Sequence, residues 1–246
     1  MKKLTTSEAE VLAAKFRSDN GLTQSGPINA KTLLRKLNIT AMYRPLSDGS
    51  YGISCRSNTG KMFMLVNSTS TRGRQHFTIG HELYHLFYDE KPTPHMCLGA
   101  STGEERNANM FASALLLPRE GVLQMINPEE VTHHKVELAT VLRIEQMYQV
   151  SRTNLLLRLK ELKLISGALF LELQAVPVKD SAREYGYDLS LYESGNDGLF
   201  IGDFGEKARI LFESNKISEG HYIELLNMIS DGGQQMISYT MRFAEV

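Results

Sequence analysis

The sequence lacks the features of membrane, secreted and disulfide-built proteins. It has no run of about 18 apolar residues, so we expect no membrane span. The basic start at Met1–Lys3 leads into a mostly polar stretch and not an apolar one, which argues against secretion and favours a cytoplasmic protein. Cys55 and Cys97 are the only cysteines. Two cysteines do not make a disulfide scaffold and suit a reducing compartment.

An excess of charge of one sign is also absent. Lys and Arg total 27 and Asp and Glu total 28, for a net charge of -1. The whole molecule therefore has no strong attraction for nucleic acid or an anionic membrane, although a local basic patch can exist. The 246 residues, 42% of them hydrophobic, are ample to bury a core. No repeat or low-complexity tract occurs, and nothing indicates an oligomeric state.

Apolar spacing and turn residues predict the order of elements before residue 130. Ser7 is the expected N-cap of the first helix, Lys91–Pro94 should break the third, and Pro118 should end the fourth. Helices are expected at 7–17, 30–37, 72–89 and 103–117, and strands at 39–44, 51–56 and 61–67.

The amino-acid composition of the chain changes after Pro128. Residues 135–164 are leucine-rich and helical, with a break near 149–151. Beyond them Gly, Asp and Tyr are more frequent, and we expect mixed strands and helices with a hairpin around 194–198. Ser218 is expected to cap a helix that ends near Ile229. Boundaries therefore fall near 130 and 166.

The most informative motif is His-Glu-x-x-His, from His81 to His85. Residues four apart lie on one face of a helix, so both imidazoles can reach one ion. Glu82 sits one step round, where it can take a proton from a water on the metal without binding the metal itself. In a chain with seven histidines the motif arises by chance on the order of one time in a hundred, so it is specific. It predicts a zinc site with Glu82 as general base.

A catalytic zinc needs a third protein ligand, and helix 103–117 offers two candidates. Glu105 shares a face with Ala108 and Ala112, and these small residues would let this helix approach the histidine helix closely. Glu104 points about 100° away and is less favoured. Asn109, one turn beyond Glu105, can hydrogen-bond a ligand. Acids at a helix start also suit the macrodipole, so a solvated N-terminus is the alternative.

Three other potential metal ligands are set aside. His76 lies five residues before His81, off the ligand face, and is interpreted as structural or at the cleft rim. His95 and Cys97 are interpreted as incidental residues of a proline-containing loop. An oxyanion stabiliser is expected but is not identified by the sequence.

Two separated blocks resemble the ImmA/IrrE family of metallopeptidases. The first is Arg-Gln-His-Phe-Thr-Ile-Gly-His-Glu-Leu-Tyr-His, and the second is Glu-Arg-Asn-Ala-Asn-Met-Phe-Ala-Ser-Ala-Leu-Leu-Leu-Pro. The resemblance covers residues 60–120 well and 1–165 loosely. Gly80 stands where the family often has alanine, and Leu117 where it often has methionine.

The resemblance implies residue roles and a substrate class. His81, His85 and Glu105 match the metal ligands, and Glu82 matches the catalytic glutamate. It implies a compact α+β, zincin-like core of the gluzincin type, at 1–130. It also implies a bacterial or mobile-element regulator that cleaves a helix-turn-helix repressor. In related peptidases the substrate lies along a sheet edge, for which 61–67 is the expected strand.

Two segments follow the expected peptidase domain. Residues 131–166 resemble a helix-turn-helix, with six basic and three acidic residues between 135 and 164. DNA binding there is open, but a helical hairpin packed on the peptidase core is favoured. Residues 167–246 form a C-terminal α+β region without an assigned role. The alternative to an enzyme is a transcription regulator or partner-binding protein with a structural metal site, which would not need Glu82.

Overall fold

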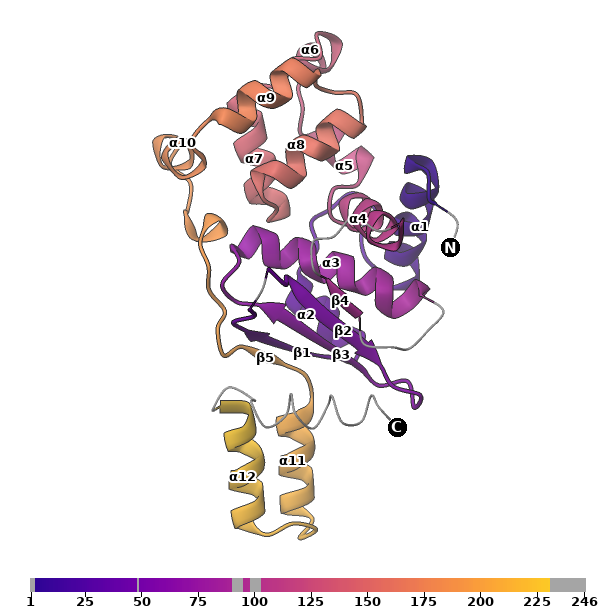
Figure 1. Cartoon of the computed structure of the whole chain (residues 1–246), viewed down its shortest axis with the longest axis vertical. Helices are drawn as coiled ribbons and strands as arrows, with labels where there is room; N and C mark the ends of the chain where they lie inside the picture. Colours follow the sequence, from indigo (N-terminus) through magenta and orange to yellow (C-terminus); the bar gives the residue numbers. More distant parts are fainter. Residues whose placement is uncertain (1–2, 48, 90–94, 98–102, 231–246) are drawn as a thin grey trace. The chain divides into compact units, whose positions relative to one another are not determined.

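The computed structural model describes residues 3–47, 49–89, 95–97 and 103–230, without the side chains of 95–97, 103–104 and 230. Over this range the chain is a mixed α+β protein with one small sheet and many helices (Figure 1). The α+β class predicted from the sequence is therefore confirmed. The expected break at 91–94 lies outside the described residues.

The helices of the first half follow the expected ranges, with two short additions at α5 and α6. The start of the first helix corrects the prediction at Ser7. Thr5 is the N-cap: its Oγ1 accepts the backbone N–H of Glu8, and the Glu8 carboxylate accepts the N–H of Thr5 (2.8 Å). This capping box satisfies two groups at once, which a cap at Ser7 would not do. The helices are α1 (Thr6–Asp19), α2 (Ala30–Lys36), α3 (Arg72–Tyr88), α4 (Gly103–Leu116), α5 (Arg119–Gln124) and α6 (Pro128–Thr132).

The second half is mainly helical. The predicted break near 149–151 is confirmed, because Gln149 adopts a left-handed conformation (φ 56°) and Ser151 caps the next helix. The predicted cap at Ser218 is confirmed by its hydrogen bond from His221 N (3.2 Å). The elements are α7 (Leu138–Tyr148), α8 (Arg152–Glu161), α9 (Gly167–Ala175), α10 (Val178–Glu184), the 3-10 helix η1 (Ser190–Tyr192), α11 (Phe204–Glu213) and α12 (Glu219–Ser230).

Within the described residues the sheet has five strands in the order β4-β2-β3-β1-β5. The strands are β1 (Ile39–Arg44), β2 (Gly52–Arg56), β3 (Met62–Asn67), β4 (His95–Cys97) and β5 (Phe200–Ile201). The prediction that 61–67 forms an edge strand was wrong, because β3 pairs with β1 on one side and β2 on the other. Its consecutive buried residues Met64–Val66 are typical of a strand covered on both faces.

Two further expectations were wrong because the pairing is not local. The segment 194–198 does not form a hairpin. The chain continues into β5, which pairs antiparallel with Ala41 and Met42 of β1. Residues 95–97 form β4 against β2 and not the expected loop. Strand pairing between distant segments leaves little trace in a short sequence window.

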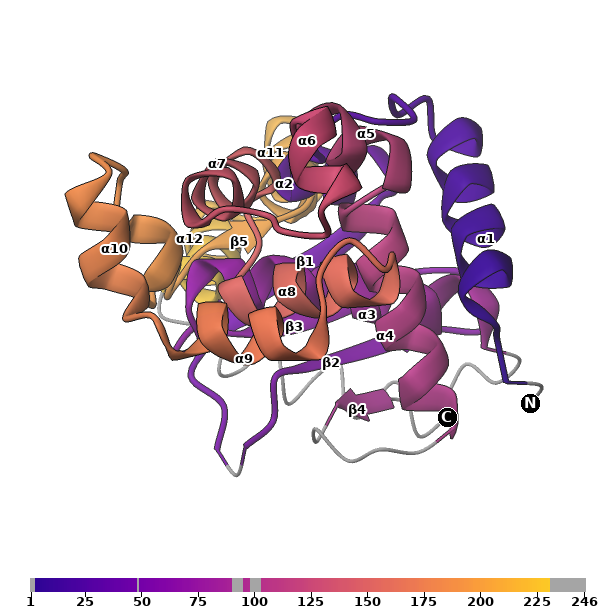
Figure 2. The same cartoon turned by 90° about the horizontal axis from the view of Figure 1, so that it is seen from above.

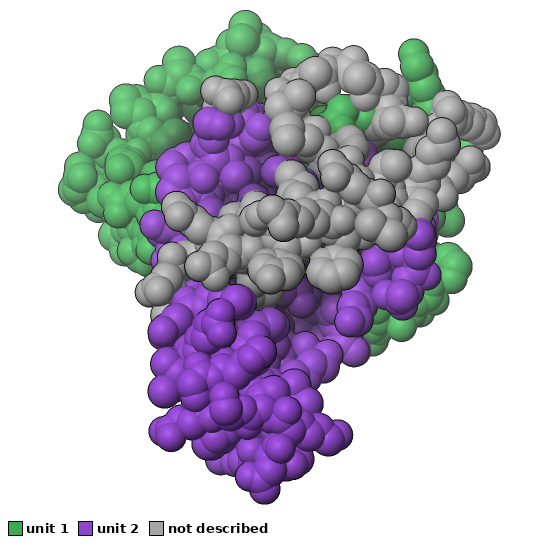
Figure 3. All heavy atoms as spheres, turned by 60° about the horizontal axis from the view of Figure 1, so that its bottom comes forward, with its two compact units in different colours: residues 1–28, 70–84, 100–195 green, residues 29–69, 85–99, 196–246 purple. Residues whose placement is uncertain are grey.

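The chain divides into two compact units, coloured separately in Figure 3. The first comprises residues 1–28, 70–84 and 100–195 and is helical. The second comprises residues 29–69, 85–99 and 196–246 and contains the sheet with α2, α11 and α12. The three-domain division at 1–130, 131–166 and 167–246 stays a prediction.

The first unit is a set of packed helices. α1 lies beside α4 (Figure 2), with Phe16 edge-on to Phe111 at a centroid distance of 5.7 Å. α8 packs on α7 and α9 and also touches α4. Glu145 and Arg152 form a buried ion pair between α7 and α8, and Tyr192 donates to Glu145 (2.7 Å). The contact with α4 joins the α7–α8 pair to a preceding helix, and the hydrogen bond from Tyr192 joins the pair to η1.

In the second unit α2 and β5 pack on β1, and α11 and α12 pair with each other. Ring stacking of Phe212 on Tyr222, at 4.9 Å, joins α11 to α12. Among the helices that the structure describes, none combines the length and the apolar character that a membrane crossing needs.

Candidate metal centre

The helix α3 presents the two histidines of the motif on one buried face. His81 and His85 are one turn apart and are 2% and 5% exposed. Ile79, Leu83 and Leu86 are buried on the rest of the helix surface and anchor it in the core. α3 is thus buried on most of its surface, including the face that carries His81 and His85.

The helix α4 approaches α3 closely, as its small residues predict. A Cβ built at Gly80 would lie 3.4 Å from Cβ of Ala112 and 3.3 Å from Cδ1 of Leu116. Ala108 and Ala112 are completely buried. The close approach places Glu105 of α4 beside His81, with 3.2 Å between Oε2 and Nε2.

The resulting cluster has the donor set and the spacing of a metal site. One ligand atom from each of His81, His85 and Glu105 lies within 4.8 Å of the other two, and all three residues are buried. Ligands bound at about 2.0–2.1 Å in a tetrahedron are about 3.3 Å apart, close to the 3.2 Å between His81 and Glu105. Two imidazoles and one carboxylate leave one of four positions open, so the residues fit a catalytic metal ion.

Each histidine makes a hydrogen bond through its Nδ1 atom. Nδ1 of His81 donates to Oδ1 of Asn109 (2.9 Å), the role expected for Asn109. Nδ1 of His85 donates to Oδ2 of Asp89 (2.6 Å). Both Nε2 atoms are thereby left with a lone pair for a metal. Asp89 was not predicted as a site residue, although its position four residues after His85 places it on the same helix face.

Glu82 completes the motif from the adjacent position on α3. Its side chain is fully buried (0% exposed) beside His81 in the sequence. A buried carboxylate next to a candidate metal ligand is well placed to act as a general base. The rival ligand Glu104 has a side chain outside the described part of the structure.

His76 has a structural role, which was one of the two interpretations of this residue from the sequence. Its Nδ1 donates to the backbone oxygen of Gln149 (3.0 Å), so it links α3 to the turn between α7 and α8. Burial lowers the pKa of His76. His95 and Cys97 belong to β4, and their side chains lie outside the description.

The basic residues of α8 mostly face the protein interior. Arg152 pairs with Glu145, and Arg158 pairs with Glu10 and Glu161. Both arginines are buried, at 3% and 1% exposure. The second helix of the helix-turn-helix-like pair therefore offers few free cations to a phosphate backbone.

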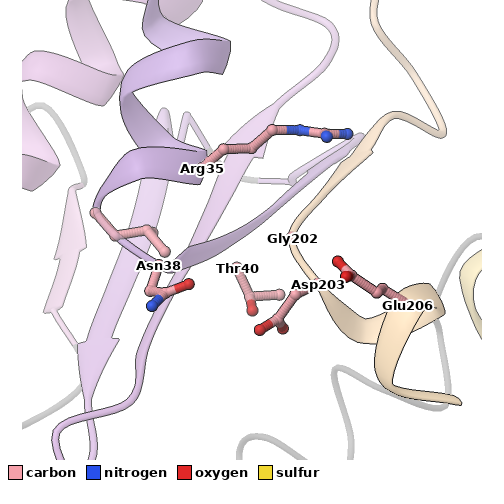
Figure 4. A pocket seen from close by; sticks show the side chains of 7 residues that line it. Arg35, Asn38, Thr40, Gly202, Asp203 and Glu206 are labelled. Atoms are coloured by element: carbon pink, nitrogen blue, oxygen red, sulfur yellow. The ribbon is translucent and has the colours of Figure 1, made fainter. Parts of the chain in front are cut away.

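A separate hollow of about 200 Å³ opens on the second unit between α2, β1 and the start of α11 (Figure 4). Its lining contains one basic side chain, Arg35, and two acidic ones, Asp203 and Glu206. None of the site residues expected from the sequence lies there. Ile39 is its one buried lining residue among those described, so the hollow has no buried polar group that would fix a ligand.

Comparison with known proteins agrees with this geometry. Residues 34–160 match the family model of a peptidase family, described as the IrrE N-terminal-like domain. The chain belongs to this family. The match covers α3, α4 and the whole His81–His85–Glu105 cluster. It confirms the resemblance to ImmA/IrrE proteins, and membership implies a protease. A search of the curated proteins finds no match.

Proposed function

We propose that this protein is a zinc-dependent endopeptidase of the gluzincin type on a zincin-like core, with His81, His85 and Glu105 as the ligands. The buried cluster of these three side chains carries the proposal. The same donor set also holds iron in some oxygenases. Membership in a peptidase family and the neighbouring Glu82 favour zinc and hydrolysis over oxygen chemistry.

The chemistry is peptide-bond hydrolysis with Glu82 as the proton carrier. A zinc ion held here would supply Lewis-acid polarisation of the scissile carbonyl and would acidify a water towards pKa 7. Glu82 takes the proton of the attacking water and delivers it to the departing amine. Asn109 and Asp89 hold the imidazoles in the tautomer that presents Nε2.

An extended substrate would lie along the β4 edge of the sheet. β3 is central, so the edge strands among those described are β4 and β5. Arg56 at the end of β2 donates to the backbone oxygen of Leu86 (3.0 Å). This hydrogen bond joins the last turn of α3, which follows His85, to β2, and β2 is the neighbour of β4. β5 has only two residues and belongs to the opposite edge. Strand addition at β4 is therefore the expected mode of substrate binding.

The substrate we propose is a bacterial helix-turn-helix transcriptional repressor, as in regulation of a mobile element. This proposal comes from the resemblance to ImmA/IrrE proteins and from family membership. A cytoplasmic location is part of it, because such a repressor works there.

The decisive experiment compares Glu82→Gln with the wild type. Purified protein is analysed for zinc and incubated with a repressor encoded next to it. Glu82→Gln should keep zinc and lose cleavage by about 10²–10⁴-fold, because the amide cannot accept the water proton. Glu172→Gln on α9 is the matched control at an exposed site and should cleave as the wild type does. Undiminished cleavage by Glu82→Gln would sink the assignment.

A non-catalytic regulator with a structural metal site is the second candidate. The α7–α8 pair, with its turn at 149–151, resembles a helix-turn-helix and is the observation in its favour. The internal ion pairs of Arg152 and Arg158 count against DNA binding. Zinc binding without cleavage, together with DNA affinity that falls steeply with salt, would favour this candidate over the enzyme. No DNA binding at low salt would remove it.

A further inference from the structure

The carboxylate that holds His85 comes from the chain just after α3 ends. Asp89 is the first residue beyond the helix, and its Oδ2 lies 2.6 Å from Nδ1 of His85. The imidazole is 2% exposed and the carboxylate 20% exposed, so the contact is largely shielded from water. A carboxylate can only accept, so Nδ1 carries the proton and Nε2 keeps its lone pair.

The position of Asp89 depends in turn on an arginine of the sheet. Arg56, the last residue of β2, donates from one guanidinium nitrogen to the oxygen of Leu86 (3.0 Å) and from the other to the oxygen of Asp89 (3.3 Å). The last carbonyls of a helix lack partners within the helix and carry its negative end. Arg56 satisfies one of them and holds the residue after the helix in the same fork.

We propose that Asp89 is a positioning residue for the metal ligand His85, and that Arg56 fixes the backbone of Asp89 for this task. The inference rests on the zinc site of the proposed function. Without Asp89 the imidazole would choose freely between its two tautomers and could rotate, so part of the binding energy for zinc would go into ordering it. The carboxylate also raises the electron density on Nε2, which makes Nε2 a stronger metal ligand.

The experiment measures zinc affinity by chelator competition together with the tautomer of His85 by ¹⁵N NMR in the metal-free protein. Asp89→Ala should weaken zinc binding by about 10–100-fold and turn His85 into a mixture of tautomers. Asp89→Asn keeps an acceptor oxygen, so it should keep the Nδ1-protonated tautomer and lose less affinity than Asp89→Ala. Arg56→Met should lose roughly threefold to tenfold, because the fork and not the acceptor is removed.

Matched controls are available in exposed ion pairs. Asp19 ends α1 and pairs with Lys15 four residues earlier, and Arg183 pairs with Asp180. Asp19→Ala and Arg183→Met should leave both the zinc affinity and the His85 spectrum unchanged. They separate the loss of a charge from the loss of this particular contact.

The outcomes separate this inference from the proposed function. A wild type that binds zinc and an Asp89→Ala variant that binds it equally well overturn the positioning role alone. A wild-type His85 that carries its proton on Nε2 also overturns it. A wild type that binds no zinc overturns the proposed function and the inference together. If Asp89→Ala does not fold, Asp89→Asn and the wild-type spectrum still decide.

Discussion

The N-terminal turn of α3 should accept a side chain at Gly73 only with a loss of stability. A Cβ there would lie 2.8 Å from N of Ser151 and 3.0 Å from the carbonyl carbon of Val150. Both are backbone atoms of the turn between α7 and α8, so neither can rotate aside. Relief needs a shift of several tenths of an ångström between two packed elements. Overpacking of this kind costs typically 1–3 kcal/mol.

Gly80 on the same helix supplies the matched comparison. The three nearest atoms to its added Cβ would be side-chain carbons of Leu116 and Ala112, at 3.3–3.4 Å. These side chains can move by a few tenths of an ångström. Replacing glycine by alanine inside a helix gains about 0.5–1 kcal/mol, which offsets a small clash. We expect Gly80→Ala to change the free energy of unfolding by less than about 1 kcal/mol. Gly73→Ala should destabilise the protein by about 1–2 kcal/mol after the same helix gain.

Urea unfolding followed by circular dichroism measures both variants under one condition. Gly167→Ala at the first residue of α9, where the new Cβ meets nothing within 4 Å, measures the gain from helix propensity at a helix start such as that of Gly73. Equal stability of Gly73→Ala and Gly80→Ala would refute the close packing of α3 on the α7–α8 turn.

The other expected outcomes concern one ligand and two buried groups. Glu105→Ala should weaken zinc binding by more than the roughly 10–100-fold typical of residues that orient a ligand, whereas Glu104→Ala should not; equal losses in calorimetric titration would reassign the ligand. Arg152→Met should cost about 3–5 kcal/mol in urea unfolding, because it leaves the buried Glu145 without its cation, and a cost below about 1 kcal/mol would contradict the buried pair. Burial lowers the pKa of His76, so the folded state favours the neutral imidazole. The free energy of unfolding is therefore at its full value above about pH 6.5. It falls by up to about 1.4 kcal/mol per pH unit as the pH drops towards the lowered pKa. Wild type and His76→Phe should therefore differ in the pH slope of unfolding between pH 7.5 and 5, and parallel slopes would count against a buried neutral imidazole.

The parts of the site that sequence could predict are those set by a single helix. His81 and His85 share a face because the helical repeat places residues four apart together. The alanines beside Glu105 favour it over Glu104, because small residues indicate a helix face that another helix can approach. The orienting role of Asn109 follows from one more turn of the same helix.

The parts that sequence could not predict depend on contacts between distant segments. The central place of β3 is set by pairing with β1 and β2, and β5 joins β1 from the far end of the chain. Asp89 combines both cases. Its spacing from His85 is local and could be predicted, but the hydrogen bond from Arg56 to its backbone depends on where β2 lies. Local periodicity carries no information about which strand becomes an edge.

The buried arginines explain how α4 keeps Glu105 in place without support from solvent. Arg17 binds the oxygen of Leu115 through its Nε (2.9 Å), and Arg158 binds the oxygen of Leu117 (3.0 Å). Burial lowers the pKa of Arg17 to about 10, so it remains cationic at neutral pH. Two cations thus stand at the negative end of α4, while Glu105 lies in its first turns at the positive end, where a carboxylate is favoured. Because these arginines come from α1 and α8, the helices around α4 fix both the position and the electrostatics of the helix that carries Glu105. On the proposed function, a carboxylate held in this way would meet a metal ion with little rearrangement, as catalysis at an open coordination position requires.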